Sequence, residues 1–199
     1  MTEKLKRLDD LRARIVRELY LDEWRDVWFF PPFDGVAGWR GTQRVMFVGL
    51  APSTGHFPTE ADRSSNPARR LYAQLKRNGF GRAHLTDVIK ERAVGRDVGE
   101  IERDKARMER YRRYFRKEIE IVQPRLIVAM GHRTDRILRG WRDRLGTAAP
   151  VLRIPHYSAR FSSAATRRRF TAKVTEIRRR YGVYRVMPRT VDPRGPKRN

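Results

Sequence analysis

Two short segments of the chain carry side chains suited to chemistry, and each is joined to an apolar run. The segment His156-Tyr157-Ser158-Ala159-Arg160-Phe161 places an imidazole, a hydroxyl, a guanidinium and aromatic rings behind the run VLRI. An imidazole exchanges or donates a proton near neutral pH, and a guanidinium binds phosphate oxygens in pairs. Taken alone, His156 suits a structural hydrogen-bonding role as well as a catalytic one.

The other segment, Gly49-Leu50-Ala51-Pro52-Ser53-Thr54-Gly55-His56, continues the apolar run QRVMFV. It contains neither the Gly-Lys-Ser/Thr of a phosphate-binding P-loop nor the GxGxxG of a dinucleotide-binding turn. We therefore expect no nucleotide cofactor here, and no other cofactor is expected.

Apolar runs typical of buried strands alternate along the chain with amphipathic helical patterns. The expected strands are residues 43–50, 83–89, 125–130 and 151–154. The expected helices are residues 3–26, 66–77, 97–122, 132–145 and 162–180. Strands that alternate with helices form a parallel sheet covered on both faces. The pattern predicts an α/β fold, a three-layer α/β/α sandwich with a central four-stranded parallel sheet.

In such a sheet the ligand crevice lies beyond the carboxyl ends of the strands. The segments expected there are residues 51–56, 87–90, 131–132 and 156–161. We expect one domain over residues 1–187, with an N-terminal helix and an aromatic-rich loop in residues 1–40. Residues 188–199, rich in Pro and Arg, are expected to form a flexible basic tail.

The composition points to a polyanionic partner. Lys and Arg number 46 against 23 Asp and Glu, which gives a formal charge of +23, and 38 of the 46 are Arg. Arginine pairs with phosphate and stacks on bases, so this bias favours a nucleic acid over mere solubility. A GC-rich genome explains part of the same bias.

Several classes of protein are excluded by what the chain lacks. It contains no cysteine, which excludes a disulfide framework and Cys-ligated zinc or iron–sulfur sites. No apolar run is long enough to span a bilayer, and the first residues lack the apolar stretch of a secretory signal. We expect a soluble, cytoplasmic, nucleoid-associated protein with no membrane partner and no metal, and a monomer because no heptad pattern is present.

The two segments together resemble the two signature motifs of the uracil-DNA glycosylase superfamily. A first strand ends in Val-Gly-Leu-Ala-Pro and a last strand is followed by His-x-Ser. Three intervening stretches agree in order and spacing. They are Leu71-Tyr72-Ala73-Gln74-Leu75 with Gly79-Phe80, then Leu85-Thr86-Asp87-Val88-Ile89-Lys90, then residues 118–131. The resemblance covers about residues 43–163 and is closest to the Gly-Leu-Ala-Pro type branches.

The resemblance implies a DNA repair enzyme of base excision, which hydrolyses the N-glycosidic bond of a deaminated or damaged base. The base would be uracil, or a purine such as hypoxanthine or xanthine, flipped out of single- or double-stranded DNA into a pocket. Such an enzyme is monofunctional when water attacks the sugar. By resemblance, His156 donates to the leaving base and Ser158 contacts a phosphate, while Arg160 or Phe161 enters the emptied stack.

The resemblance also implies where the base is held. The pocket residues it implies are Gly49, Leu50, Ala51, Pro52, Ser53 and Phe57, with Asp87 at the position that reads the base. Arg63 and Lys90 are further candidates for phosphate contacts.

Three departures from the family pattern bear on activity. Many members carry Asp or Asn at the position of Ala51 to activate water, and a methyl group cannot do so; His56, Glu60 and Asp62 are candidate substitutes. The related branches usually carry a four-Cys iron–sulfur cluster, which this chain cannot hold, and the aromatic-rich residues 24–39 are expected to fill that space. Tyr157 replaces the usual Pro.

Asp87 stands where the family has Asn, and its role depends on its charge. An ionised carboxylate only accepts hydrogen bonds, which suits adjacent donors such as N1–H and N2–H₂ of a guanine-like purine. Asp87 is alternatively protonated, or a structural cap without base contact. Two other functions therefore stay open: a catalytically silent nucleic-acid-binding protein on the same fold, and an unrelated basic RNA- or ribosome-associated protein.

Overall fold

The structure is a computed structural model, and it describes residues 2–19, 29–52, 67–91, 98–157 and 164–181. Within these ranges the chain alternates helices and strands as the sequence predicts. The strands are β1 (Gln43–Gly49), β2 (Ala83–Asp87), β3 (Leu126–Met130) and β4 (Val151–Ile154). The longer helices are α1 (Glu3–Leu19), α2 (Pro67–Arg77), α4 (Lys105–Val122), α5 (His132–Trp141) and α6 (Ala164–Tyr181). Shorter helices are η1 (Gly38–Arg40), α3 (Val98–Arg103) and η2 (Arg142–Arg144).

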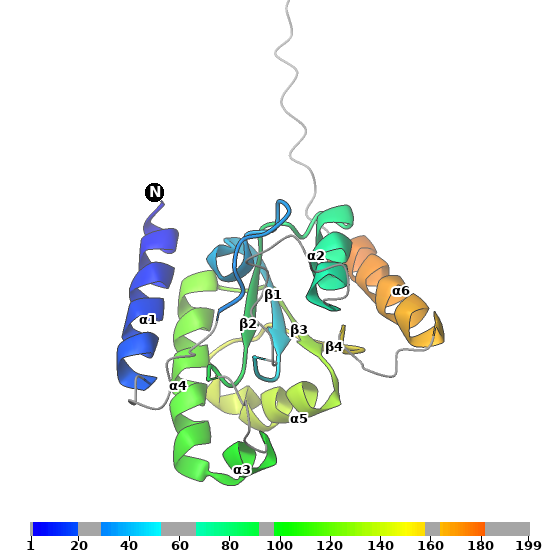
Figure 1. The fold of residues 1–199 in the computed structure, drawn as a ribbon. Coiled ribbons are helices and arrows are strands. Elements are labelled where there is room, and N and C mark those ends of the chain that lie inside the picture. Colours follow the sequence, from blue (N-terminus) through cyan, green and yellow to red (C-terminus); the bar gives the residue numbers. More distant parts are fainter. Residues whose placement is uncertain (1, 20–28, 53–66, 92–97, 158–163, 182–199) are drawn as a thin grey trace, which may run out of the picture.

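The four strands form one parallel sheet in the order β2-β1-β3-β4 (Figure 1). Residues of α1, α3, α4 and α5 pack into one apolar cluster on one face of the sheet. Residues of α2 and α6 form the cluster on the other face. The predicted α/β fold with flanking helices and a four-stranded parallel sheet is therefore confirmed.

The register of the central strands brings two expected functional segments together. β1 and β2 pair in parallel with Gly49 opposite Asp87, the last residue of each strand. β1 pairs with β3 on its other side, and β3 pairs with β4 up to Ile154. The carboxyl ends of all four strands consequently lie along one edge of the sheet, where the crevice was expected.

The prediction of one long helix over residues 97–122 is wrong. The structure has α3 and α4 instead, separated by Asp104 in an extended conformation. The Asp104 carboxylate accepts a hydrogen bond from the Arg107 backbone N–H at 3.0 Å, which caps the first turn of α4. A side chain that satisfies an orphan N–H favours a helix start over continuation.

Aromatic residues of the N-terminal third attach α1 to the rest of the domain. The Trp39 indole N–H donates to the Leu8 carbonyl of α1 at 3.2 Å, and the Phe29 ring meets the Trp39 ring edge-on at 4.6 Å. Trp39 is 2% exposed. This part of the expected aromatic-rich loop is thus core, while residues 24–28 lie outside the described ranges.

Removing the cap between α3 and α4 tests this account of the break. We expect Asp104→Ala to lower the free energy of unfolding by about 1 kcal/mol, because the Arg107 N–H loses its acceptor. Asp104→Asn keeps an acceptor oxygen and is the matched control, expected to retain most of the stability. Urea denaturation measures the stability of both variants. Equal stability of Asp104→Ala and wild type would contradict the assignment of Asp104 as the cap of α4.

Candidate functional site

The chain after β1 and the chain after β2 continue side by side beyond the sheet. The Val88 N–H donates to the Gly49 carbonyl at 3.0 Å, and the Ile89 N–H donates to the Leu50 carbonyl at 2.9 Å. Ala51 is half-buried and Pro52 is buried. These bonds extend the parallel pairing by two residues and fix the Gly-Leu-Ala-Pro segment against the residues that follow Asp87.

Asp87 lies across the end of β1, directly over Gly49. A Cβ added to Gly49 would stand 2.0 Å from Asp87 Oδ1, so glycine leaves the space that the carboxyl group occupies. Asp87 is only 6% exposed. Burial raises the pKa of Asp87 to about 7. The positive charge of Lys90 opposes this rise, and the negative charge of Glu118 adds to it. Near neutral pH, Asp87 therefore exists in both protonated and ionised forms.

His156 follows β4 and lies against the end of β3. A Cβ on Gly131, the residue after β3, would stand 3.5 Å from His156 Cβ. The His156 ring stacks on the Tyr157 ring with centroids 4.5 Å apart and an angle of 25° between planes. Burial lowers the pKa of His156, which favours the neutral imidazole. A neutral imidazole carries one N–H donor and one acceptor nitrogen.

Two tyrosines connect His156 with Asp87. Burial raises the pKa of Tyr157, and the nearby Asp87 carboxyl adds to this effect. Burial also raises the pKa of Tyr72, with further contributions from Tyr157 and Asp87. The Tyr72 hydroxyl donates to the Pro31 carbonyl at 2.7 Å. The His156–Tyr157 stack and the electrostatic influence of Asp87 on both tyrosines place these four side chains in one region at the carboxyl edge of the sheet, which we call the cluster.

Sequence reasoning missed both tyrosines as site residues. Tyr157 was visible only as a replacement for the usual Pro, and Tyr72 only as one residue of a stretch that resembles the family. Where the Tyr72 phenol packs is decided by tertiary structure, which helical periodicity does not reveal. The replacement of Pro by Tyr was the signal that could have identified Tyr157.

Lys90, which the sequence analysis predicts to contact phosphate, is instead buried in an ion pair. Lys90 is 1% exposed, and its ammonium group lies 2.5 Å from Glu118 Oε1 of α4. It also donates to the Thr86 hydroxyl at 2.6 Å and to the Asp87 carbonyl. A buried ammonium requires such partners, because transfer of a lone charge out of water costs several kcal/mol.

The network around the buried Lys90–Glu118 pair also includes His84 of β2. His84 Nε2 lies 3.1 Å from Glu118 Oε2, and both residues are fully buried. Burial opposes ionisation of Glu118, but the Lys90 charge and the contact with His84 outweigh it and lower the pKa of Glu118. Lys90 additionally lies over the ring of Trp39, at 5.6 Å. Through the hydrogen bond that Lys90 donates to the Asp87 carbonyl, this network fixes the backbone of Asp87.

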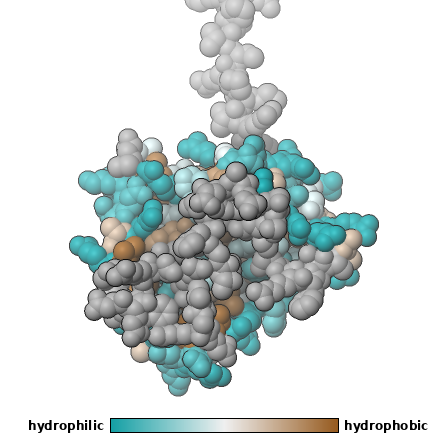
Figure 2. Space-filling view, in the orientation of Figure 1, coloured by the Kyte–Doolittle hydropathy of each residue, from teal (hydrophilic) through white to brown (hydrophobic). Residues whose placement is uncertain are grey.

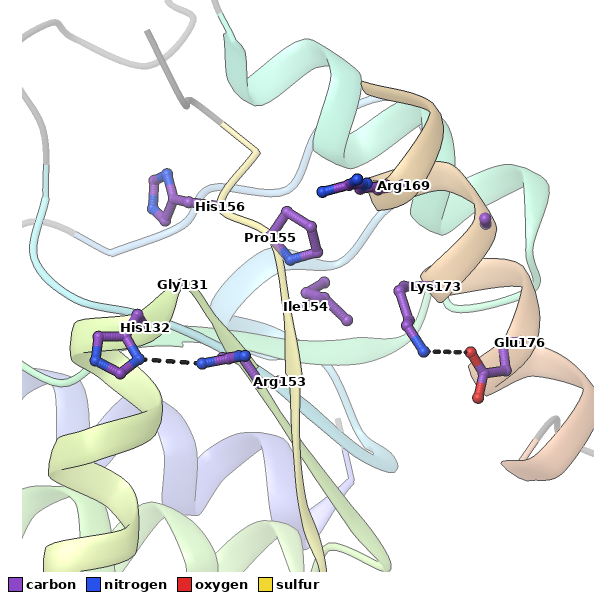
Figure 3. Close-up of a pocket in the computed structure, with 10 residues that line it drawn as sticks. Gly131, His132, Arg153, Ile154, Pro155, His156, Arg169, Lys173 and Glu176 are labelled. Atoms are coloured by element: carbon purple, nitrogen blue, oxygen red, sulfur yellow. Dashed lines mark hydrogen bonds and ion pairs between the residues drawn. The ribbon is translucent and has the colours of Figure 1, made fainter. Parts of the chain in front are cut away.

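A groove of about 580 Å³ borders this cluster on the side of β4. It is lined by Gly131, His132, Arg153, Ile154, Pro155, His156, Arg169, Ala172, Lys173 and Glu176. Figure 3 shows Arg169 extending from α6 towards Pro155, while Arg153 of β4 points to His132. His156 lines the same groove, so the groove and the cluster are continuous.

The remaining predicted site residues lie outside the described ranges. They are the catalytic candidate His56, the pocket candidates Ser53 and Phe57, and the DNA-binding candidates Arg63, Ser158, Arg160 and Phe161. In the part of the chain that the structure describes, no three His, Cys, Asp or Glu side chains group as metal ligands would. No helix there is both long and apolar enough to cross a membrane.

The buried ion pair leads to a stability prediction. We expect Lys90→Met to lower the free energy of unfolding by about 3–5 kcal/mol, because Glu118 then stays buried without its partner. The double variant Lys90→Met with Glu118→Leu should recover most of the loss, since both charges are removed. Lys117→Met removes an exposed ion pair with Glu120 and should cost less than about 1 kcal/mol.

Chemical denaturation of the four proteins measures these differences. If Lys90→Met were as mild as Lys117→Met, Lys90 would not be the partner on which buried Glu118 depends.

The comparisons with known proteins agree with this geometry. The family model described as the uracil DNA glycosylase superfamily matches residues 39–178. A search of curated proteins found no match. The matched range begins at Trp39 and contains the whole sheet, the Asp87–His156 cluster and most of α6. This chain belongs to the uracil DNA glycosylase superfamily.

Proposed function

We propose that the protein is a monofunctional DNA glycosylase that excises deaminated bases from DNA. The observation that carries the proposal is the cluster at the strand ends. Asp87 ends β2 and His156 follows β4, which are the two edge strands of the sheet. Tyr157 stacks on the His156 ring, and burial together with the Asp87 carboxyl raises the pKa of Tyr157. The cluster thus combines a donor for a leaving base with a carboxyl group for its edge.

His156 would act on the leaving group. In the reaction the C1′–N bond breaks with its electron pair on the base, and water adds its oxygen to C1′ and gives up a proton. Negative charge therefore develops on a base oxygen, where a preorganised donor is most effective. The lowered pKa of His156 supports a neutral imidazole whose N–H serves as that donor.

Asp87 would read the edge of the base. Uracil, hypoxanthine and xanthine each present a ring N–H beside a carbonyl oxygen, a pair produced by deamination. A protonated carboxyl group offers the complementary pair, one acceptor oxygen and one O–H donor. The pKa of about 7 keeps this form populated at neutral pH. The protonated Asp87 would thus replace the amide that the family uses at this position.

The neighbouring lysine supports hydrolysis rather than a Schiff-base mechanism. Lys90 is paired with Glu118 and 1% exposed, so its amine is not open to the sugar. Ala51 favours a second candidate function, the silent nucleic-acid-binding protein, because its methyl group cannot activate water. Retention of His156, together with a carboxyl group at Asp87, favours the enzyme.

An excision assay tests the proposal. Labelled oligonucleotides with one uracil, hypoxanthine, xanthine, mismatched thymine or oxidised guanine are incubated single- and double-stranded, then cut at abasic sites with alkali. We expect cleavage at deaminated bases and a loss of at least about 100-fold in His156→Ala, typical of a lost acid or oxyanion donor. His156→Phe is the matched variant, because it keeps a ring on Tyr157 and lacks the N–H.

Cleavage that persists in both His156 variants would contradict the assigned role of His156. Binding without cleavage of any lesion would leave the silent binding protein as the function.

A pH profile tests the assignment of Asp87. We expect the single-turnover rate on a deaminated base at subsaturating protein to fall above about pH 7, by up to tenfold per pH unit, because the protonated fraction of Asp87 falls. Asp87→Asn carries a permanent donor and acceptor and should keep its rate from pH 7 to 9. An identical alkaline decline in both proteins would show that another group causes it.

A further inference from the structure

We propose that the groove between β4 and α6 binds the phosphodiester backbone of the DNA strand next to the extruded nucleotide. The inference rests on the proposed function in taking DNA as the ligand, and it adds a surface beyond the base pocket. His156 belongs to the cluster and also lines the groove, so a strand whose base enters the cluster would continue along this groove.

The lining of the groove has the chemistry that phosphates require. The groove is lined by three cationic side chains and one carboxylate: Arg153, Arg169 and Lys173, with Glu176. Lys173 pairs with Glu176 at 2.7 Å. Arg153 Nη1 lies 3.0 Å from His132 Nδ1, which holds its guanidinium at the groove (Figure 3). Arg169 has no acidic partner within the described residues and extends towards Pro155. A guanidinium held in place but not neutralised suits a phosphate oxygen.

The helix continues the cationic surface away from the pocket. α6 carries seven Arg and Lys residues and one Glu, and all eight side chains are exposed. Arg169, Lys173, Glu176 and Arg180 recur at spacings of four, three and four, so they share one side of the helix. This row is about 16 Å long, the axial length of about five nucleotides of one strand.

Figure 2 shows hydrophilic residues gathered over the edge of the molecule where α6 lies in Figure 1. Only Phe170, Val174 and Ile177 of α6 are buried. The seven Arg and Lys side chains and Glu176 of α6 are exposed to solvent.

The test compares two pairs of charge-removing variants. Arg153→Gln with Arg169→Gln alters the groove, and Arg110→Gln with Arg113→Gln alters exposed positions of α4 on the other face of the sheet. All four side chains are exposed, so both variants should fold, and circular dichroism melting checks this. Affinity is measured by fluorescence anisotropy on a duplex with one tetrahydrofuran abasic analogue, at a series of salt concentrations.

We expect the groove pair to lower the slope of log affinity against log salt by about 1.8, because each lost phosphate contact on duplex DNA removes about 0.9. The α4 pair should leave the slope within experimental error of wild type. Equal slopes in wild type and the groove pair, or equal losses in both pairs, would overturn the proposal.

A second measurement locates the contact on the strand. Single phosphates on either side of the abasic analogue are replaced in turn by uncharged methylphosphonates. Wild type should lose affinity at one or two flanking positions, and the groove pair should be insensitive at those same positions. A groove pair with the same sensitive positions as wild type would overturn the proposal.

Neither readout requires excision. A protein that binds through the groove and removes no base would retain this inference for DNA binding while the proposed glycosylase function failed.

Discussion

The arrangement of the site depends on an ion pair that is sealed inside the domain. Lys90 and Glu118 meet at 2.5 Å with almost no exposure to solvent, one from the turn after β2 and the other from α4. In a medium of low polarity each charge requires the other, which leaves the turn few alternative conformations. Lys90 also donates to Thr86 and to the carbonyl of Asp87, so the pair fixes the backbone from which the carboxyl group extends. Trp39 lies over the same ammonium group and donates to α1, which ties the N-terminal helix to this centre.

The parallel sheet places the ends of segments that are far apart in the sequence along one edge. Parallel strands end at one side of the sheet, so Asp87 and His156 lie along the same carboxyl edge although 69 positions separate them. Burial then gives the two groups different tasks: it lowers the pKa of His156 and raises that of Asp87. The first change keeps a neutral donor and the second keeps a proton on a carboxyl group. In the proposed function, the protonated Asp87 would take the place of an amide, and its charge would decide which bases it accepts.

The fold was largely predictable, because local signals and the global arrangement agree. Pro67 at the start of α2 and the left-handed Gly79 after its end mark that helix to within a residue, and β4 has the expected bounds. The break at Asp104 was not predicted, since apolar residues continue at helical spacing across it and only the cap shows where α4 begins. Lys90 could not be placed either: its position after a strand suggests the crevice, but its partner Glu118 is 28 residues away. Tyr72 and Tyr157 join the site through packing of α2 and the end of β4 against the sheet, which no local pattern encodes.

The central claim is that this cluster receives a deaminated base and releases it from the sugar. The most direct measurement is the detection of free bases by mass spectrometry after incubation of nitrous-acid-treated DNA, which contains uracil, hypoxanthine and xanthine, with the protein. The account predicts that one or more of these bases appears in the filtrate with wild type, and that His156→Phe releases none above background. Intact deaminated nucleosides in the DNA and no free base with wild type would contradict it.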